Sequence, residues 1–221
     1  MKQQHIVLLA LLMFAIITMS GCNNSSDPVT PPSGNLPGTI AIGSQVWADK
    51  NLDVSTYRNG DPIPQVQDSI VWSNLTTGAW CYYNGDAGLG TIYGKIYNWY
   101  AVNDSRGLAP LGYHVASDAE WTTLTNYLGG DTIAGGKLKA LTLWQAPNLG
   151  ATNSSGFTAL PAGFRNNIGN CYNITYDGYF WTSTEFNSAQ AWDRYLWNER
   201  KDINRYSLNK QYGLTVRCIK E

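Results

Sequence analysis

Turn-forming residues interrupt this chain so often that long helices and long strands have little room in it. After residue 50 the sequence breaks at Asn59-Gly60-Asp61-Pro62, at Thr77-Gly78 and at Asn84-Gly85-Asp86. Glycine and asparagine supply the backbone conformations that tight turns need, and proline fixes one of them in advance. The 221 residues include 22 Gly and 9 Pro. The sequence therefore predicts short elements joined by many loops.

A fold with short elements needs bulky side chains to build its core, and this chain has them. Aromatic residues make up 13% of the chain and charged residues only 14%, well below the roughly 25% that is usual for a soluble domain. The 15 basic and 16 acidic side chains leave a net charge of −1. Such a balance gives no support for binding to nucleic acid or to another strongly anionic surface.

The N-terminal segment has the pattern of an export signal. Lys2 precedes an uncharged run, residues 6–19, that is short for a membrane span of about 20 residues. It is followed by Met19-Ser20-Gly21-Cys22, which resembles the lipobox of bacterial lipoproteins, although Met19 stands where Leu or another aliphatic residue is usual. The resemblance implies a signal peptide over residues 1–21 and a lipid anchor on Cys22. Ordinary secretion and a buried structural cysteine are the alternatives.

Residues 22–38 have the composition of a solvated tether. Pro, Ser and Asn dominate this segment, and it has no apolar periodicity, so it cannot form a core. Residues 39–221 fall within the size range of one domain. We therefore expect a single domain that is held at the outer membrane and faces either the cell surface or the periplasm.

The clearest helix signal lies in the middle of that domain. Ser117 and Glu120 have the spacing of a capping box, in which each side chain accepts a backbone N–H of the other residue. The apolar face of the predicted helix consists of Trp121, Leu124 and Leu128. Gly129-Gly130 favours its end, and residues 133–141 favour a second short helix. A third, over residues 93–102, has only weak support.

Strand signals lie on both sides of these helices. The pair Gly43-Ser44 between two β-prone runs predicts a tight hairpin over residues 39–47. The further strand candidates are residues 70–72, 80–83, 157–160, 179–184, 191–197 and 214–219. Strands, then central helices, then strands again favour an α+β domain with antiparallel pairing, short strands and long loops.

Six separated blocks of the sequence occur in the same order in one protein family. They are residues 42–52, 93–102 (YGKIYNWYAV), 112–121 (GYHVASDAEW), 155–165 (SGFTALPAGFR), 180–184 (FWTST) and 216–220 (VRCIK). Together they resemble the Fibrobacter succinogenes major paralogous domain, which occurs in lipoproteins and secreted proteins of Bacteroidetes and Fibrobacteres. The resemblance covers about residues 39–221. It implies a C-type-lectin-like fold that is related in architecture to formylglycine-generating enzymes, and it guarantees no activity.

The chain departs from that family at its cysteines. The family usually has Cys-Pro before its Trp-His-Val block, whereas this chain has Ala109-Pro110. The cysteine that the family offers as partner for the C-terminal one is therefore missing. Cys218 is then unpaired, or paired with Cys81 or with Cys171, and at least one of the three thiols is left over.

The sequence contains few of the residues and motifs that catalysis or metal binding would need. His114 is the only histidine beyond the signal segment, so a histidine-dependent triad or a multi-histidine metal site is not supported. A phosphate-binding glycine motif is absent. Glu120 has a capping explanation and Glu199 lies in a mixed-charge segment, so a pair of glycosidase carboxylates is not evident. We predict a protein that is not an enzyme and has no cofactor and no metal.

Residues 191–199 (AWDRYLWNE) are the best candidate for a binding surface, because flat aromatic rings alternate there with hydrogen-bonding groups. Such pairs suit a sugar, whose C–H face packs on a ring while its hydroxyls bond to polar groups. The candidate residues are Trp192, Asp193, Tyr195, Trp197 and Asn198. On a strand, Trp192 and Asn198 would lie on one side and the other three on the opposite side, so some of the rings belong to the core in the competing interpretation.

These features together favour a non-catalytic, lipid-anchored binding module that recognises a carbohydrate or a surface protein. A structural or adhesive envelope component that assembles with other proteins is the alternative, and an enzyme related to formylglycine-generating enzymes is less favoured. Calcium-dependent sugar binding is not favoured either, because the Glu-Pro-Asn or Gln-Pro-Asp pattern of C-type-lectin sugar sites is absent.

Overall fold

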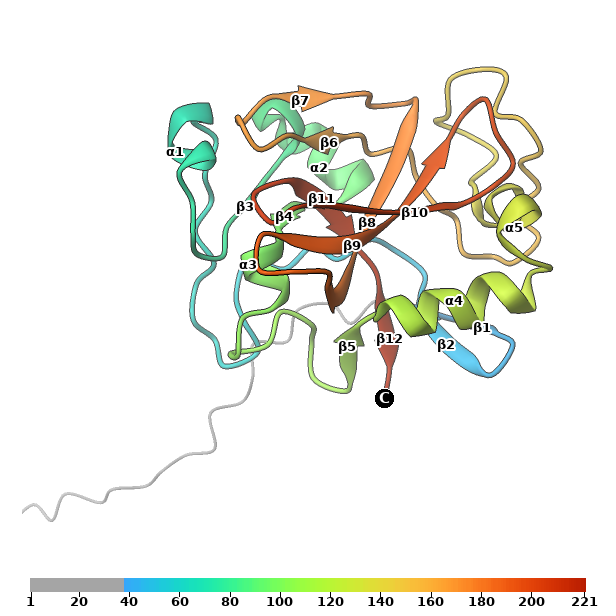
Figure 1. Cartoon of the computed structure of the whole chain (residues 1–221), viewed down its shortest axis with the longest axis horizontal. Coiled ribbons are helices and arrows are strands. Elements are labelled where there is room, and N and C mark those ends of the chain that lie inside the picture. The colour runs from blue at the N-terminus through green and yellow to red at the C-terminus, as the bar shows by residue number, and fades with distance from the viewer. Residues whose placement is uncertain (1–37) are drawn as a thin grey trace, which may run out of the picture. The chain divides into compact units, whose positions relative to one another are not determined.

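Residues 38–221 are described by the computed structural model, and they begin in a hairpin that packs beside the C-terminal strand. The hairpin consists of β1 (Thr39–Ile42) and β2 (Gln45–Ala48), joined through Gly43 at a φ of 62°, a left-handed conformation that glycine adopts without steric cost. β12 (Cys218–Lys220) pairs with β2 and with β5 (Tyr113–Val115), which completes a four-stranded sheet in the order β1-β2-β12-β5. Figure 1 shows these four strands together at one end of the domain. The predicted hairpin is confirmed.

A second sheet of eight strands forms the centre of the domain. Its main path runs β10 (Asn204–Asn209), β9 (Gln190–Trp197), β8 (Asp177–Glu185), β11 (Gly213–Val216), β4 (Ile96–Asn98) and β3 (Trp80–Cys81). The short strand β6 (Phe164–Arg165) pairs with β11 and with β7 (Cys171–Tyr172). All pairs are antiparallel except β11 with β8, which is parallel. The fold is therefore α+β, as expected.

The helices are short, and they cover the sheets from outside (Figure 1). They are α1 (Ser69–Ser73), the 3₁₀ turn η1 (Tyr83–Gly85), α2 (Ala87–Tyr93), α3 (Trp99–Val102), α4 (Asp118–Tyr127) and α5 (Asp131–Leu138). α4 begins with the predicted capping box: Glu120 N–H donates to Ser117 Oγ at 3.3 Å, and Ser117 N–H donates to Glu120 Oε2 at 2.7 Å. None of the helices within residues 38–221 is long and apolar enough to cross a membrane.

Two of the predicted strands were wrong. Residues 70–72 lie in α1, because Asp68 Oδ1 accepts the Val71 N–H at 2.8 Å and caps a helix there. Residues 157–160 form only a single bridge through Ala159, and the carbonyls of Phe157 and Thr158 accept from the buried Arg217 side chain instead of from a neighbouring strand. The short helix expected within residues 93–102 is present as α3, but it covers only Trp99–Val102, because Ile96–Asn98 form β4.

Aromatic side chains fill the interior, as the composition predicts. Five tryptophans that fall in the family blocks or in the early loops are buried: Trp47, Trp72, Trp99, Trp121 and Trp181. Trp47 and Trp121 meet at a centroid distance of 5.0 Å with a T-shaped geometry, the arrangement that the ring quadrupoles favour. These rings act as core and are not available as ligand-binding surfaces.

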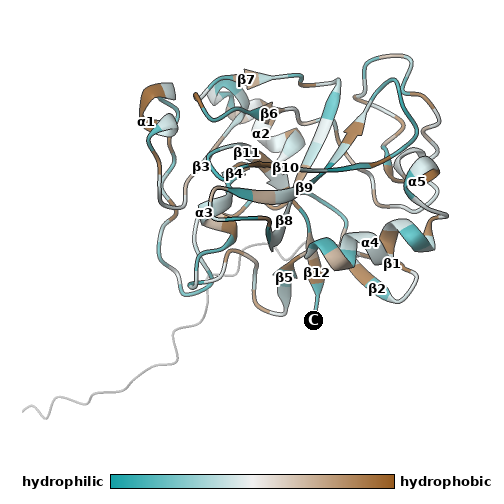
Figure 2. Cartoon of the chain, in the orientation of Figure 1, coloured by the Kyte–Doolittle hydropathy of each residue, from teal (hydrophilic) through white to brown (hydrophobic). Residues whose placement is uncertain are grey.

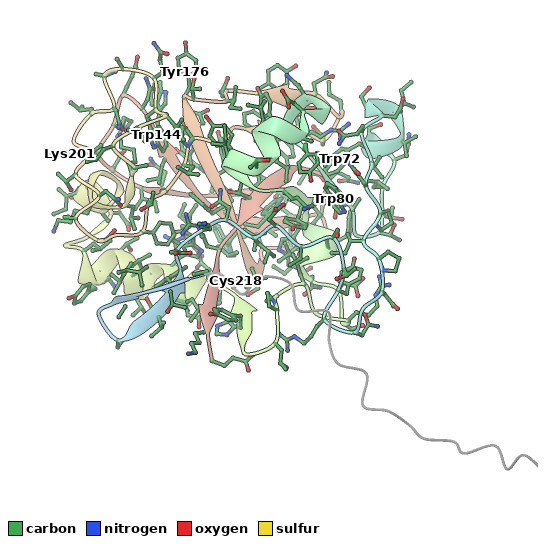
Figure 3. The ribbon with its side chains drawn as sticks, turned by 180° about the vertical axis from the view of Figure 1, so that it is seen from behind. Trp72, Trp80, Trp144, Tyr176, Lys201 and Cys218 are labelled. Atoms are coloured by element: carbon green, nitrogen blue, oxygen red, sulfur yellow. The ribbon has the colours of Figure 1, made fainter. Side chains whose placement is uncertain are left out.

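The three cysteines among residues 38–221 are all free thiols. Cys218 lies in the central cluster beside Val115, whereas Cys81 belongs to a separate cluster that includes Trp72. Figure 3 shows Cys218 and Trp72 well apart. Burial raises the pKa of both buried thiols, Cys81 and Cys218, to about 12. None of the pairings that we considered is present, and Cys22 lies outside the described residues.

Candidate functional site

The five residues predicted as a binding site lie on β9 or directly after it, but they do not form one surface. Trp192 and Arg194 share one face of β9, where Arg194 Nη2 donates to Asp118 Oδ1 of α4 at 2.8 Å. Asp193 and Tyr195 lie on the opposite face, because successive residues of a strand alternate. The predicted alternation is correct, and it separates the candidates into two groups.

The Trp192 ring is largely covered by neighbouring side chains. The guanidinium of Arg205 lies 3.3 Å from the centroid of this ring, and the ring of Phe186 approaches it at 4.6 Å in a T-shaped geometry. Arg205 is in turn held by Asp118, whose Oδ1 accepts from its Nε at 2.8 Å. A ligand would have to displace this charged pair to stack on Trp192.

Asn198 and Trp197 hold loops in place. Asn198 is buried, and its Nδ2 donates to the carbonyls of Gln145 and Ala146 at 3.3 and 3.2 Å. Trp197 is half-buried, and its backbone carbonyl accepts from Lys139 Nζ at 3.1 Å. These contacts fix the long segment after α5 against the end of β9.

Tyr195, by contrast, belongs to a row of aromatic rings that crosses the sheet. We call it the tyrosine row, and its members are Tyr172, Phe164, Tyr212, Tyr179, Tyr195 and Tyr206. Phe164 contacts Tyr172, Tyr179 and Tyr212, and the row continues from Tyr179 through Tyr195 to Tyr206. The centroids of Tyr179 and Tyr195 are 4.5 Å apart and stacked, Phe164 lies 5.0 Å from Tyr179, and Tyr206 lies 6.3 Å from Tyr195.

Strand register builds this row. Tyr179 of β8 and Tyr195 of β9 are directly opposite each other, and so are Phe164 of β6 and Tyr172 of β7. Directly opposed side chains in antiparallel strands lie on the same face within contact distance. The remaining members are Tyr206 of β10 and Tyr212 of the turn before β11, so the six rings come from five strands and one turn.

The tyrosine row is half-buried along its middle and most exposed at its two ends. Side chains stand roughly perpendicular to a sheet, so the stacked rings of Tyr179 and Tyr195 turn their edges outward. The terminal rings are the most exposed members, with exposed fractions of 44% for Tyr172 and 53% for Tyr206. Each of them has a single ring contact within the row.

Two buried carboxyl groups lie on the same face of the sheet as the tyrosine row. Asp177 accepts from the Tyr195 hydroxyl at 3.1 Å and from Asn173 Nδ2 at 2.6 Å, and burial raises the pKa of this carboxyl. Asp193 is 0% exposed, and neither of its carboxyl oxygens has a hydrogen-bond partner within residues 38–221. Burial raises the pKa of Asp193 to about 8, so most of this group is protonated at neutral pH.

The phenol groups of the row are also kept neutral. Burial, followed by the nearby charge of Asp177, raises the pKa of Tyr179 and Tyr195 above the usual range. The row thus combines aromatic carbon with neutral hydroxyls, which donate and accept hydrogen bonds. This chemistry suits an uncharged, polyhydroxylated ligand and provides no activated nucleophile or base.

Sequence reasoning found Tyr195 and Asp193 but missed the other ring members. The sequence indicates these other rings in one way: six of the 14 tyrosines fall within residues 172–212. In the part of the chain that the structure describes, no group of three or more His, Cys, Asp or Glu side chains could hold a metal ion. His114, the one histidine within residues 38–221, lies 2.6 Å from Glu120 Oε1 through its Nε2 and supports the capping box of α4.

A family model for the Fibrobacter succinogenes major domain matches residues 40–220, which is nearly the whole described chain. The chain therefore belongs to this family. Comparison with curated proteins found no match, and neither did comparison with solved structures.

Proposed function

We propose that this protein is a non-catalytic binding module of the cell envelope and that its tyrosine row binds carbohydrate. The observation that carries this proposal is the continuous row of half-exposed rings on one face of the sheet, with neutral hydroxyls among them. A globular protein normally buries so much aromatic carbon or uses the exposed part in an interface.

A sugar fits this surface better than a charged ligand does. The C–H groups on one face of a pyranose carry a small positive charge that the negative face of an aromatic ring attracts. Tyr206 and Tyr172, the most exposed rings, lie at the two ends of the row. The phenol hydroxyls between them can bond to the equatorial hydroxyls of a sugar chain lying along the row.

The sequence supports a place for this module in the envelope. The lipobox-like segment before Cys22 and the tether over residues 22–38 would hold the domain at the outer membrane, facing the cell surface or the periplasm. The family resemblance adds a C-type-lectin-like fold, in which a loop-rich domain presents a binding surface. Nothing in this proposal needs a metal or a cofactor.

A structural or adhesive role among other envelope proteins is the second candidate, and an apolar patch on α1 favours it. Ile70 and Val71 are 73% and 53% exposed, and Ile168 on the nearby β6–β7 turn is also exposed. Figure 2 shows the apolar colour of α1 at the edge of the domain. An enzyme of the formylglycine-generating kind is least supported, since burial raises the pKa of all three thiols in the domain.

A glycan panel with matched variants tests the carbohydrate proposal. The purified full-length protein is applied to immobilised polysaccharides, once with calcium and once with a chelator, beside Tyr206→Ala and Tyr127→Ala. Tyr127 is an exposed tyrosine of α4 outside the row, so it controls for the loss of a surface ring. We expect binding that the Tyr206 variant loses and the Tyr127 variant keeps. Wild-type protein that binds no glycan but copurifies with envelope proteins would support the structural role instead.

A further inference from the structure

A pocket lies on the other side of the β6–β7 hairpin from the tyrosine row. It has a volume of about 350 Å³, and six of the residues that line it are Gln67, Asn84, Gly85, Arg165, Asn170 and Cys171. They come from the segment before α1, from η1 and from the hairpin itself. Three chain segments that are far apart in sequence therefore converge on one small space.

Arg165 gives this pocket a positive charge that no carboxylate neutralises. The residue is 2% exposed, and no carboxylate among residues 38–221 forms an ion pair with it. Its guanidinium lies 4.4 Å from the centroid of the Trp72 ring, which is labelled in Figure 3. A buried cation without a counter-ion attracts an anion more strongly than an exposed one does.

The guanidinium is already fixed in position. Its Nε donates to the Gly169 carbonyl at 2.8 Å, and its Nη1 and Nη2 donate to the Val66 and Gln67 carbonyls at 2.7 Å each. These three bonds use three of the five donors of the group. A ligand would therefore not have to order this side chain, and pre-organisation of this kind lowers the entropic cost of binding.

Amide groups around the rim can complete an anion site. The side chains of Gln67, Asn84 and Asn170 are exposed, and none of their amides makes a hydrogen bond to the described part of the chain. Each amide carries two N–H donors. A carboxylate has two oxygens with room for about four hydrogen bonds, which matches a set of converging amides above a positive charge.

The hairpin places this pocket next to the end of the tyrosine row. Phe164 and Arg165 are neighbours on β6, as are Tyr172 and Cys171 on β7, so one member of each pair faces the row and the other faces the pocket. β7 pairs only with β6 and so forms an outer edge. A glycan that covers Tyr172 needs only to pass this edge strand to bring a substituent into the pocket.

We propose that the pocket binds the carboxylate of an acidic sugar, so that the ligand class is a uronate-containing glycan. This inference rests on the proposed carbohydrate function and extends it. Glycan binding would then have two parts: aromatic contacts along the row and one charged contact behind the hairpin.

Two oligosaccharides that differ only in charge test the pocket. The full-length protein is titrated by calorimetry with a galacturonate oligomer and with the methyl ester of the same oligomer, whose carboxyl groups are neutral. We expect the acid to bind at least about tenfold more tightly than the ester, since opposite charges a few ångströms apart are worth that much even at moderate screening. Equal affinities for the two oligomers would overturn the proposal.

A matched pair of variants locates the charged contact. Asn170→Asp adds a negative charge on the pocket rim, and Asn167→Asp adds the same charge at an exposed position of the same turn that does not line the pocket. Neither change removes a buried group, so both variants should fold. Asn170→Asp should weaken acid binding at least about tenfold and so remove the advantage of the acid over the ester, while Asn167→Asp should keep that advantage. Equal losses in the two variants would overturn the site.

The experiments distinguish failure of the pocket proposal from failure of the proposed carbohydrate function. If neutral glycans bind and Tyr206→Ala abolishes their binding while the acid has no advantage, the pocket proposal fails and the proposed function stands. If no glycan binds but an acidic peptide does, and Asn170→Asp abolishes its binding, then the carboxylate comes from a protein and both proposals are wrong.

Discussion

Arg217, which lies between β11 and β12, donates from its Nε to Asn51 Oδ1 at 2.8 Å, and this buried contact joins the C-terminal strands to a loop 166 residues earlier in the chain. The same guanidinium donates to the carbonyls of Ala48, Phe157 and Thr158. One side chain thus ties the N-terminal hairpin, the long loop after α5 and the C-terminal strand together.

Replacing this side chain should therefore weaken the whole domain. An Arg217→Met variant leaves several buried acceptors without a donor, and each costs about 1–3 kcal/mol, so we expect the free energy of unfolding to fall by about 3–5 kcal/mol. Urea denaturation followed by tryptophan fluorescence measures it. The control is Arg200→Met, which removes an exposed ion pair with Asp202 and should cost less than about 1 kcal/mol. Similar losses in the two variants would contradict this account of Arg217.

Local signals explain why parts of the fold could be predicted from the sequence. The capping box at Ser117 and Glu120 and the turn at Gly43-Ser44 act through neighbouring residues, so their patterns are visible in a few letters. Residues 157–160 resemble a strand equally well. The carbonyls of Phe157 and Thr158 nevertheless accept from Arg217, about 60 residues away, and no local pattern contains that partner.

The same difference holds for the candidate site. Alternation along 191–197 correctly placed Tyr195 and Asp193 on one face, because it depends only on the strand period. Tyr179 and Tyr206 reach that face through the register of β8, β9 and β10. Pairing register is decided by the whole sheet, so the tyrosine row could not be predicted from any one segment.

The buried carboxyl of Asp193 should make stability depend on pH. In the folded protein burial raises the pKa of this group to about 8, from an ordinary value of 3.8. The unfolded chain loses its proton first as the pH rises, so this group costs stability progressively between about pH 4 and pH 8, by at most about 1.4 kcal/mol for each pH unit. An Asp193→Asn variant lacks that cost. Its advantage over wild type should grow across this range and stay constant above it.

Denaturation curves of both proteins at several pH values measure this difference. Comparing wild type with Asp193→Asn cancels the contributions of all other titrating groups, provided that both proteins unfold in two states. An advantage that stays the same from pH 4 to pH 8 would mean that the folded protein does not hold this proton.

Lys139 should fasten the long segment that follows α5. Its buried Nζ donates to the carbonyls of Leu149, Trp197 and Arg200 at 3.0, 3.1 and 2.8 Å. A Lys139→Met variant keeps the apolar stem and removes the three donors, so residues 144–152 should lose amide protection while α4 keeps it. Hydrogen exchange with mass spectrometry detects the loss. Uniform loss over the whole domain would show instead that Lys139 stabilises the fold globally.

The three thiols of the domain should differ in reactivity. Cys171 is half-buried, whereas Cys81 and Cys218 are fully buried, and a reagent must reach the sulfur before it can react. In the native protein iodoacetamide should modify Cys171 first, and Cys81 and Cys218 should react only after denaturation. Peptide mapping by mass spectrometry identifies the modified residue, and a Cys171→Ser variant is the control. Rapid modification of Cys218 in the native protein would contradict its place in the core.

The central claim is that one face of β9 binds carbohydrate and the other does not. The most direct test measures the affinity of the full-length protein for its best glycan in Tyr195→Ala and in Trp192→Ala, two ring deletions three residues apart on the same strand. Our account predicts that Tyr195→Ala weakens binding by about fivefold or more, as for an aromatic contact worth about 1 kcal/mol, and that Trp192→Ala leaves it unchanged. Loss of binding in Trp192→Ala with normal affinity in Tyr195→Ala would contradict it and place the site beside Arg205.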